Sequence, residues 1–317
     1  MALINTVLGP IDGSELGFTL SHEHIATGAA GIHQTYPEFF DREGTVEDAV
    51  TALKQAYDEG VRSYIDPTTF DIGRDIALMQ EVSRKSGVHI VPTTGSHQAI
   101  PRSFMQISSD AIAAVYIREI EEGIEGTGVK AGIIKSASDR GGITELEEKV
   151  LRAVARASKH TGTPVYTHTW SPDRVGEQQI GILEDEGVDL SRVYIGHSND
   201  TRDVDYIVGL LKKGVWVGLD RFPGGRYPDV PLWQERTEII KKLLDDGWGN
   251  RIMLGHDHSI PKSQPTPETQ EARRQYQPEG YSFISRHVLP YLRELGSSES
   301  DIQGIMVDNP RRFLEGN

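Results

Sequence analysis

The fold is decided by the stretch Phe18-Thr-Leu-Ser-His-Glu-His-Ile25, an apolar run that ends in two histidines. His22 and His24 are two residues apart, and on a β-strand such residues point to the same face. Two aligned imidazoles suit one divalent transition metal. A pair of this kind also occurs as two ordinary core or surface histidines. The metal hypothesis therefore depends on ligand-type residues elsewhere in the chain.

Short apolar or β-branched runs alternate with helical patterns along the whole sequence. The eight predicted strands are residues 18–24, 62–67, 88–94, 130–135, 164–169, 193–198, 215–220 and 251–256. The clearest helical patterns are residues 45–59, 144–160, 203–213, 235–246 and 282–295. Eight strands alternating with helices predict a parallel sheet that closes into a (β/α)₈ TIM barrel, with residues 1–317 as a single domain.

The rival architecture is an open, doubly wound sheet. Such a sheet usually carries a glycine-rich phosphate loop after its first strand. This chain has Ser21-His-Glu-His24 at that place, which favours the barrel. Two connections, 221–234 and 257–281, are long and rich in proline, and they predict functional loops over the barrel mouth. The helix over 45–59 is expected to begin at Thr45 with a capping box.

The composition excludes several classes of function. The chain of 317 residues has a net charge of −14, which argues against nucleic-acid binding and disfavours a polyanionic substrate unless a local cationic pocket overrides the global field. It has no cysteine, so nitrogen and oxygen atoms must hold any metal. No signal peptide and no run of 18 apolar residues is evident, so we expect a cytoplasmic protein that does not span a membrane.

Ligand-type side chains stand at the ends of five of the eight predicted strands. They are His22, His24, Lys135, His168, His197 and Asp257. In a barrel, the ends of the strands meet at one mouth, where chemistry takes place. Histidines and a carboxylate suit zinc, manganese, cobalt or iron. We therefore expect one binuclear metal site.

Lys135 needs a separate explanation because a protonated ammonium cannot bind a metal. Burial beside cations would lower its pKa, and the neutral amine could then react with carbon dioxide. The resulting carbamate has two oxygens that could bridge two metals. The alternative is a lysine that caps the strand or contacts an anionic substrate, and the sequence alone does not choose between them.

Six motifs together resemble the phosphotriesterase family of the amidohydrolase superfamily, and most closely its phosphotriesterase-like lactonases. They are Ser21-His-Glu-His24, Gly132-Ile-Ile-Lys135, Tyr166-Thr-His-Thr169, Ile195-Gly-His-Ser-Asn-Asp200, Gly218-Leu-Asp-Arg221 and Leu254-Gly-His-Asp257. The resemblance runs from about Gly9 to Phe313. It implies a (β/α)₈ barrel with two metals, zinc being the first choice, bridged by a hydroxide and a carboxylated Lys135.

The same resemblance implies a role for each site residue. His22, His24 and Asp257 would hold the buried metal. His168 and His197 would hold the more exposed one. Asp257 would also accept a proton.

Substrate binding is implied for Arg221, which matches an arginine of the lactonase branch, and for Asp200, which is linked to it. A structural ion pair is the alternative for these two residues. His97 stands near the place where the lactonases carry a tyrosine, so it is a third candidate and leaves the fine specificity open.

The other histidines and several aromatic residues are less informative. Strand alternation predicts that His256 points away from the barrel interior, whereas His258 is a candidate for the pocket wall. Trp170, Tyr227 and Trp233 follow strand ends and are candidate walls of an apolar cavity, with packing under the long loops as the alternative.

The function implied by the resemblance is the opening of lactones, such as N-acyl-homoserine lactones or other aliphatic lactones, by a metal-bridging hydroxide. Promiscuous organophosphate hydrolysis and a homodimer are further implications. One rival uses the same site mainly as an aryldialkylphosphatase or as another ester or amide hydrolase. A second rival, a metal-loaded barrel without turnover, is disfavoured because every ligand and the base are present.

Overall fold

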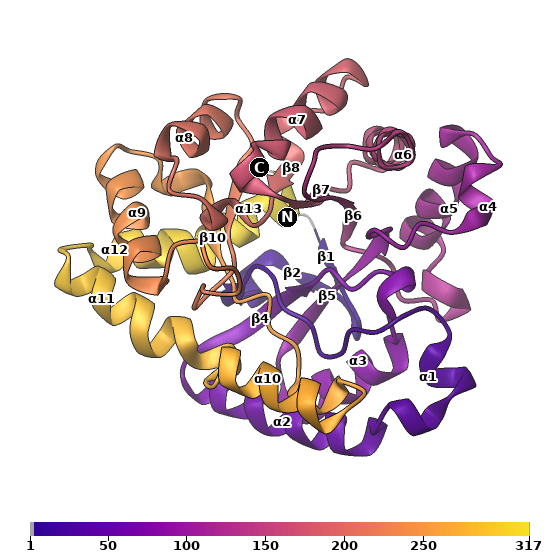
Figure 1. The fold of residues 1–317 in the computed structure, drawn as a ribbon, viewed down its shortest axis with the longest axis horizontal. Coiled ribbons are helices and arrows are strands. Elements are labelled where there is room, and N and C mark those ends of the chain that lie inside the picture. The colour runs from indigo at the N-terminus through magenta and orange to yellow at the C-terminus, as the bar shows by residue number, and fades with distance from the viewer. Residues whose placement is uncertain (1–2, 317) are drawn as a thin grey trace.

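A parallel barrel forms the centre of the molecule, and helices surround it (Figure 1). The computed structural model describes residues 3–316. The barrel strands are β3 (Phe18–Leu20), β4 (Val61–Asp66), β5 (His89–Gly95), β6 (Ile133–Ser138), β7 (Val165–Thr169), β8 (Val193–Ile195), β9 (Trp216–Leu219) and β10 (Ile252–Leu254). Neighbouring strands pair in sequence order and all run parallel. The predicted (β/α)₈ barrel is therefore confirmed.

The surrounding helices vary from one turn to 17 residues in length. They are α1 (Ile32–Thr35), α2 (Arg42–Asp58), α3 (Ile76–Ser86), α4 (Arg102–Met105), α5 (Ser109–Glu121), α6 (Glu145–Thr161), α7 (Val175–Asp185), α8 (Val204–Lys212), α9 (Trp233–Asp245), α10 (Pro267–Tyr276), α11 (Leu289–Glu294), α12 (Glu299–Gln303) and α13 (Asn309–Glu315). Helix α6 illustrates which features of the sequence allowed the helices to be predicted. It buries one apolar stripe, and Thr144 and Glu147 cap its first turn reciprocally.

The barrel closes between its first and last strands through backbone bonds near the mouth. The Ser21 N–H donates to the Leu254 carbonyl at 2.8 Å, and the His24 N–H donates to the His258 carbonyl at 2.8 Å. The buried Glu23 carboxylate accepts from the backbone N–H of His258 at 3.2 Å and from the N–H two residues before it at 2.8 Å. Glu23 therefore fastens the predicted metal-binding stretch to the end of β10.

Aromatic side chains fill the barrel below the mouth. Tyr166 and Tyr194 stack with their ring centroids 4.1 Å apart, and Phe313 of the C-terminal helix α13 packs against both. An antiparallel hairpin of β1 (Leu3–Thr6) and β2 (Gly9–Asp12) precedes the barrel. No strand was predicted before residue 18, because these two strands are only four residues long each.

Several predicted boundaries differ from the structure. The strand predicted over 130–135 is Ile133–Ser138, and the strand predicted over 193–198 ends at Ile195. Helix α2 begins at Arg42, and not at Thr45, because the Asp41 carboxylate caps it by accepting from the Gly44 N–H at 2.9 Å. The connection 257–281 is not only a loop, since it contains helix α10. That helix buries none of its own side chains, which is why no apolar period revealed it.

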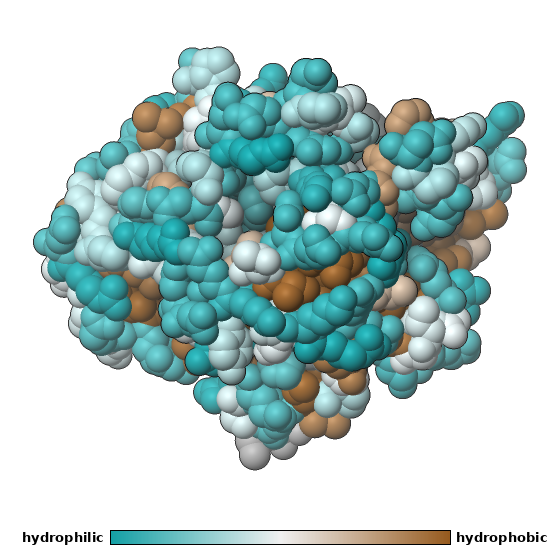
Figure 2. All heavy atoms as spheres, turned by 90° about the horizontal axis from the view of Figure 1, so that it is seen from below, coloured by the Kyte–Doolittle hydropathy of each residue, from teal (hydrophilic) through white to brown (hydrophobic). Residues whose placement is uncertain are grey.

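The surface is mainly hydrophilic, with apolar residues gathered in small groups on the face drawn in Figure 2. Within residues 3–316, no helix has the length and apolarity needed to cross a bilayer.

Candidate metal centre

The six predicted ligands meet at the carboxyl end of the barrel. A cavity of about 390 Å³ opens there, and five of the six residues line it. These five are His22, His24, Lys135, His168 and Asp257. The sixth, His197, is fully buried and contacts the ring of His168. Residues more than 230 positions apart in the sequence are thus brought to one place, as the strand-end argument required.

His22, His24 and Asp257 have the spacing of a metal-binding triad. The Nε2 atoms of the two histidines lie 3.5 and 3.3 Å from the same carboxylate oxygen, Oδ1 of Asp257. A tetrahedral site with bonds of about 2.1 Å separates its ligand atoms by roughly 3.4 Å. The Nδ1 atom of His24 is 2.6 Å from the Thr68 hydroxyl, which fixes the ring orientation. These donor atoms therefore fit a divalent cation.

His168 and His197 form a second pair of facing imidazoles. Nδ1 of His168 lies 2.9 Å from Nε2 of His197, and their rings meet edge to face. The buried Nε2 of His168 makes no hydrogen bond within the described chain, although an Asp139 carboxylate oxygen is 3.5 Å away. A cation between the facing nitrogens would satisfy both lone pairs. This pair therefore also fits a metal.

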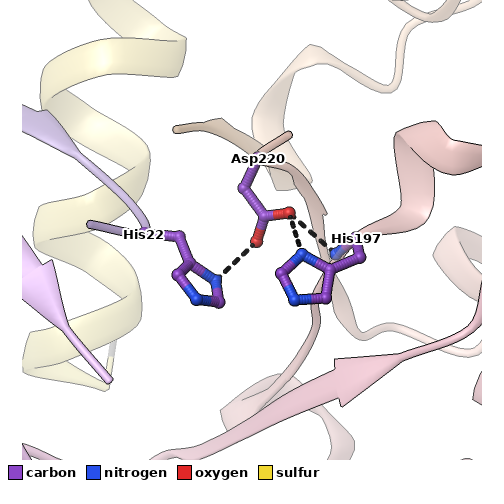
Figure 3. Close-up of side chains that lie close together, drawn as sticks. All are labelled: His22, His197 and Asp220. Carbon is purple, nitrogen blue, oxygen red and sulfur yellow. Dashed lines mark hydrogen bonds and ion pairs between the residues drawn. The ribbon is translucent and has the colours of Figure 1, made fainter. Parts of the chain in front are cut away.

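Asp220 lies at the centre of the site but was not among the predicted site residues. Its two carboxylate oxygens lie 3.1 Å from Nδ1 of His22 and 2.9 Å from Nδ1 of His197 (Figure 3). The backbone N–H of His197 and the hydroxyl of Tyr194 donate to the same carboxylate, at 2.8 and 2.7 Å. Asp220 thus leaves the Nε2 atoms of both histidines free to bind a cation.

The charge of Asp220 is stabilised by these same partners. Burial alone would raise its pKa, but the imidazoles of His197 and His22 hold the pKa well below its usual range. The sequence did contain a signal for this residue. Asp220 ends a strand, as the predicted ligands do, and it stood within one of the quoted motifs.

Two of the predicted ligands have an unusual backbone conformation. His197 has a φ of 57° and Asp257 a φ of 54°, in the left-handed region. A side chain other than glycine pays roughly 1–2 kcal/mol there. Both residues follow the end of a strand, and the left-handed turn directs their side chains towards the other ligands.

Lys135 is buried in the barrel and has no ion-pair partner within residues 3–316. Its Nζ atom lies 5.0 Å from the ring centroid of Tyr166. Burial lowers the pKa of Lys135 to about 7, so a large fraction is the neutral amine near neutral pH. The facing residue is Gly95, with a φ of 103°, where a Cβ atom would stand only 2.0 Å from the Lys135 carbonyl oxygen. Only glycine allows this close approach of the two strands.

The candidate substrate-binding residues form a buried ion network. Arg221 donates from Nε to Oδ2 of Asp257 at 3.0 Å and from Nη1 to Oδ2 of Asp200 at 2.6 Å. Arg236 donates to the other oxygen of Asp200 at 2.8 Å. Arg221 lines the cavity, whereas Asp200 does not. Asp200 therefore acts on the site by holding Arg221.

Asp257 is ionised despite its burial. Burial opposes the charge, but the imidazole of His24 and the guanidinium of Arg221 hold the pKa of Asp257 well below its usual range. One of its oxygens faces the histidines and the other faces Arg221. A carboxylate placed in this way can bind a cation and still accept a proton.

His97 lies at the cavity wall, as the sequence suggested. Its Nε2 atom is 3.4 Å from Nδ1 of His168, and its backbone N–H donates to the Asp71 carboxylate. Burial lowers its pKa well below the usual value, which keeps the ring neutral. His97 can therefore offer a neutral hydrogen-bond donor to a bound molecule.

The remaining expectations have mixed outcomes. His256 does point away, because its Nδ1 is 2.6 Å from Glu23. His258 does not line the cavity but is buried against Gln277. Trp233 is not a wall either, since it packs on Phe283 at the outer helices.

Trp170 and Tyr227 do lie at the mouth. They meet edge to face at 4.9 Å, and together they line a second cavity of about 540 Å³. Of the two, Tyr227 also borders the metal-site cavity.

The family model of the phosphotriesterase family matches residues 2–314. An aryldialkylphosphatase of Saccharolobus solfataricus is 36% identical over 311 residues, which cover 96% of each chain. A phosphotriesterase homology protein of Mycobacterium tuberculosis is 36% identical over 335 residues, covering 99% of this chain and 98% of the other. An N-acetyltaurine hydrolase of Xenopus tropicalis is 26% identical over 98% of this chain and 97% of its own length. With these matches and the site geometry together, the chain belongs to the phosphotriesterase family, and it is a metal-dependent hydrolase.

Proposed function

We propose that this protein is a lactonase that uses a binuclear metal centre. His22, His24 and Asp257 would hold one cation, and His168 and His197 the other. Lys135 would bridge them as a carbamate, formed when its neutral amine adds to carbon dioxide and releases one proton. Zinc is the first choice for this nitrogen and oxygen donor set, and cobalt, manganese and iron are also suited to it. When bound, the cations would lower the pKa of a water molecule and polarise the substrate carbonyl.

Side chains of the protein would accept and return the proton during hydrolysis. Water adds to the lactone carbonyl carbon, and the Asp257 carboxylate accepts the proton that the water loses. The bond between the carbonyl carbon and the ring oxygen then breaks. The proton passes to the ring oxygen, and the product is a hydroxy acid. Arg221 keeps Asp257 ionised until it accepts this proton and holds its orientation, because its Nε atom donates to Oδ2 at 3.0 Å.

The observation that carries the choice of lactones is the position of Arg221. Its guanidinium lines the cavity and is fixed between Asp257 and Asp200. A phosphotriester has a tetrahedral centre with three large substituents, which need space on every side. A flat lactone ring needs only a slot and a donor to hold it. Arg221 removes the space and supplies the donor.

Side-by-side kinetics on one metal-saturated preparation test this proposal. We expect kcat/KM to be at least about 100-fold higher for lactones than for paraoxon-type triesters, a difference of roughly 2.7 kcal/mol in transition-state binding. Arg221→His should shift the ratio towards triesters. Equal or better efficiency on the triester would contradict the lactonase assignment and favour an aryldialkylphosphatase.

Amide hydrolysis is the second candidate function. It is supported by the relatives named as N-acetyltaurine hydrolases, which match over nearly the whole chain. The same carboxylate could return its proton to a leaving amine in place of an alcohol. Measuring kcat/KM for a series of acyl amides beside the lactones would show whether the enzyme prefers to hydrolyse an amide bond or a lactone ester bond.

A further inference from the structure

The mouth of the barrel is basic although the protein is acidic. The chain has a net charge of −14. Three arginines nevertheless line the metal-site cavity: Arg221, Arg226 and Arg273. Arg221 is neutralised by two carboxylates. The Asp139 carboxylate also lines the cavity, but it lies 3.5 Å from His168, so Arg226 and Arg273 are the two arginines left to attract an anion.

Arg273 has no carboxylate partner. It lies on helix α10, and no ion pair to it occurs within residues 3–316. Its only side-chain hydrogen bond there is a long one, 3.4 Å, to Oε1 of Gln277. Burial lowers the pKa of Arg273, the charge of Asp257 opposes this shift, and the charge of Arg226 adds to it. A half-buried guanidinium without an ion pair costs free energy, and no carboxylate of residues 3–316 forms one with Arg273.

Helix α10 holds Arg273 at a defined place over the cavity. Gln277, one turn later, is buried and donates to the carbonyls of His256 and Phe222 at 2.6 and 3.0 Å. These carbonyls lie in the connections just after the last two barrel strands. The position of Arg273 is therefore tied to the barrel and prepared before a ligand binds.

Arg226 stands on the opposite connection, after Gly224 and Gly225, and its side chain is 43% exposed. Its nearest ion pair is a loose contact of 3.5 Å with Oδ2 of Asp257, an oxygen that Arg221 already holds at 3.0 Å. Arg226 thus retains donors that can reach another anion. The two connections that overhang the mouth each contribute one such arginine.

We propose that Arg226 and Arg273 form a subsite for an anionic substituent of the substrate, so that the enzyme prefers lactones bearing a carboxylate or a phosphate group. Guanidinium groups bind both anions through paired N–H donors. This inference rests on the proposed function and specifies which lactones the site opens.

The cavity lining supports an anionic substituent over an apolar chain. Ile72 and Pro265 are its only aliphatic side chains among the described residues. Most of the other lining side chains are polar, including Thr27, Gln98 and Gln264. A long acyl chain would find little apolar surface and would cover unpaired arginines, which costs free energy.

Matched substrates give the sharpest test. A γ-lactone with a carboxylate substituent is compared with the same lactone whose carboxylate is a primary amide, because the two have nearly the same shape. A phosphate-bearing γ-lactone and an octanoyl-homoserine lactone complete the panel. We expect kcat/KM to be at least tenfold higher for one or both anionic lactones than for the amide and the acyl lactone.

Matched variants separate charge from structure. In Arg273→Gln we expect KM for the preferred anionic lactone to rise roughly tenfold or more, the scale of a charged hydrogen bond, while kcat stays within about threefold. The amide lactone should be unaffected, and Arg273→Lys should recover part of the loss. Arg274→Gln is the control, since Arg274 is exposed on the same helix and paired with Glu271. Calorimetric binding of the ring-opened dicarboxylate should weaken in parallel.

The outcomes separate this inference from the proposed function. If the wild-type enzyme opens the amide or acyl lactone as well as the anionic ones, the anion subsite is wrong and the lactonase remains. If the preference survives in the Arg226→Gln, Arg273→Gln double variant, these residues do not form the subsite. If no lactone of any charge is opened while esters, amides or triesters are, the proposed function itself fails.

Discussion

At the scale of single residues, Asp220 orients two candidate ligands with one carboxylate. Each of its oxygens accepts from one imidazole, so a single side chain fixes the tautomers of His22 and His197. An asparagine has the same shape but only one accepting oxygen. Its amide N–H would face an Nδ1–H donor, and one ring would have to turn or change its tautomer.

We therefore expect Asp220→Asn to weaken the binding of at least one metal by roughly 10–100-fold, the usual effect of losing an orienting partner. Competition with a chromophoric chelator measures this directly. Asp245→Asn is the control, because Asp245 is exposed and its only ion-pair partner within residues 3–316 is Lys241. Unchanged affinity for both metals would show that the Asp220 carboxylate does not orient the metal ligands.

Individual residues were predictable from sequence only where chemistry and position coincided. His22, His168 and Asp257 are metal-ligand types at strand ends, so they could be named without a structure. Asp220 has the same position, but its function depends on His22, 198 residues away. The pairing of Asp200 with Arg236 was invisible for the same reason.

At the scale of elements, helix α10 lies over the barrel mouth and is attached to the barrel mainly at its C-terminal end. It buries none of its side chains, and Gln277 just beyond it makes the buried bonds to the mouth. Removing that amide leaves two buried carbonyls without donors, at a cost of about 1–3 kcal/mol for each group.

We expect Gln277→Ala to release the helix while the barrel stays folded. Amide hydrogen exchange over 267–276 should become at least tenfold faster, with little change in the barrel strands. KM for the best lactone should rise as well. Gln275→Ala is the matched control, because Gln275 is exposed and, among the described residues, its side chain hydrogen-bonds only to Glu271. Equal exchange in both variants would show that other contacts hold the helix.

Elements with a buried stripe were predicted well, and elements without one were not. Helix α6 was predicted from the regular spacing of its apolar residues, and its N-terminus has a full capping box. Helix α10 has capping residues, Thr266 and Thr269, but no apolar face to accompany them. Hairpin β1–β2 is short and lies outside the repeating strand–helix order. Periodicity reports burial, so it is silent where an element stays at the surface.

At the scale of the molecule, metal binding and stability should be linked. Without cations the site gathers four imidazoles and a buried lysine, and the facing nitrogens of His168 and His197 stand 2.9 Å apart. Ligands that bind only the folded state stabilise it, by about 2.7 kcal/mol at 100 times Kd.

We expect chelator-treated protein to unfold at a temperature at least roughly 5 °C lower than the loaded protein, a shift of ~2–4 °C per kcal/mol being typical of large domains. Two equivalents of metal per chain should restore it. Calorimetry beside elemental analysis measures both quantities. Saturation at one equivalent or none would contradict the binuclear centre.

The barrel as a whole was predictable because its strands are buried on both faces and alternate with helices in a strict order. Its closure was not predictable in detail. The seam depends on Glu23, whose carboxylate binds backbone groups more than 230 residues later. The basic mouth was also hidden, since a net charge describes the entire surface and not one cavity.

The left-handed backbone of His197 and Asp257 has a consequence for laboratory evolution. Glycine, and often asparagine, adopts that conformation at little cost, so replacements there relieve strain in the metal-free chain. A library sorted only for thermal survival without metal would be rewarded for changes at these two positions. Each such variant would lose a candidate metal ligand, His197 or Asp257, as its thermal stability increased. Selections for stability on this scaffold should therefore also require catalytic turnover in every round. Otherwise the selected variants will be thermally stable but inactive.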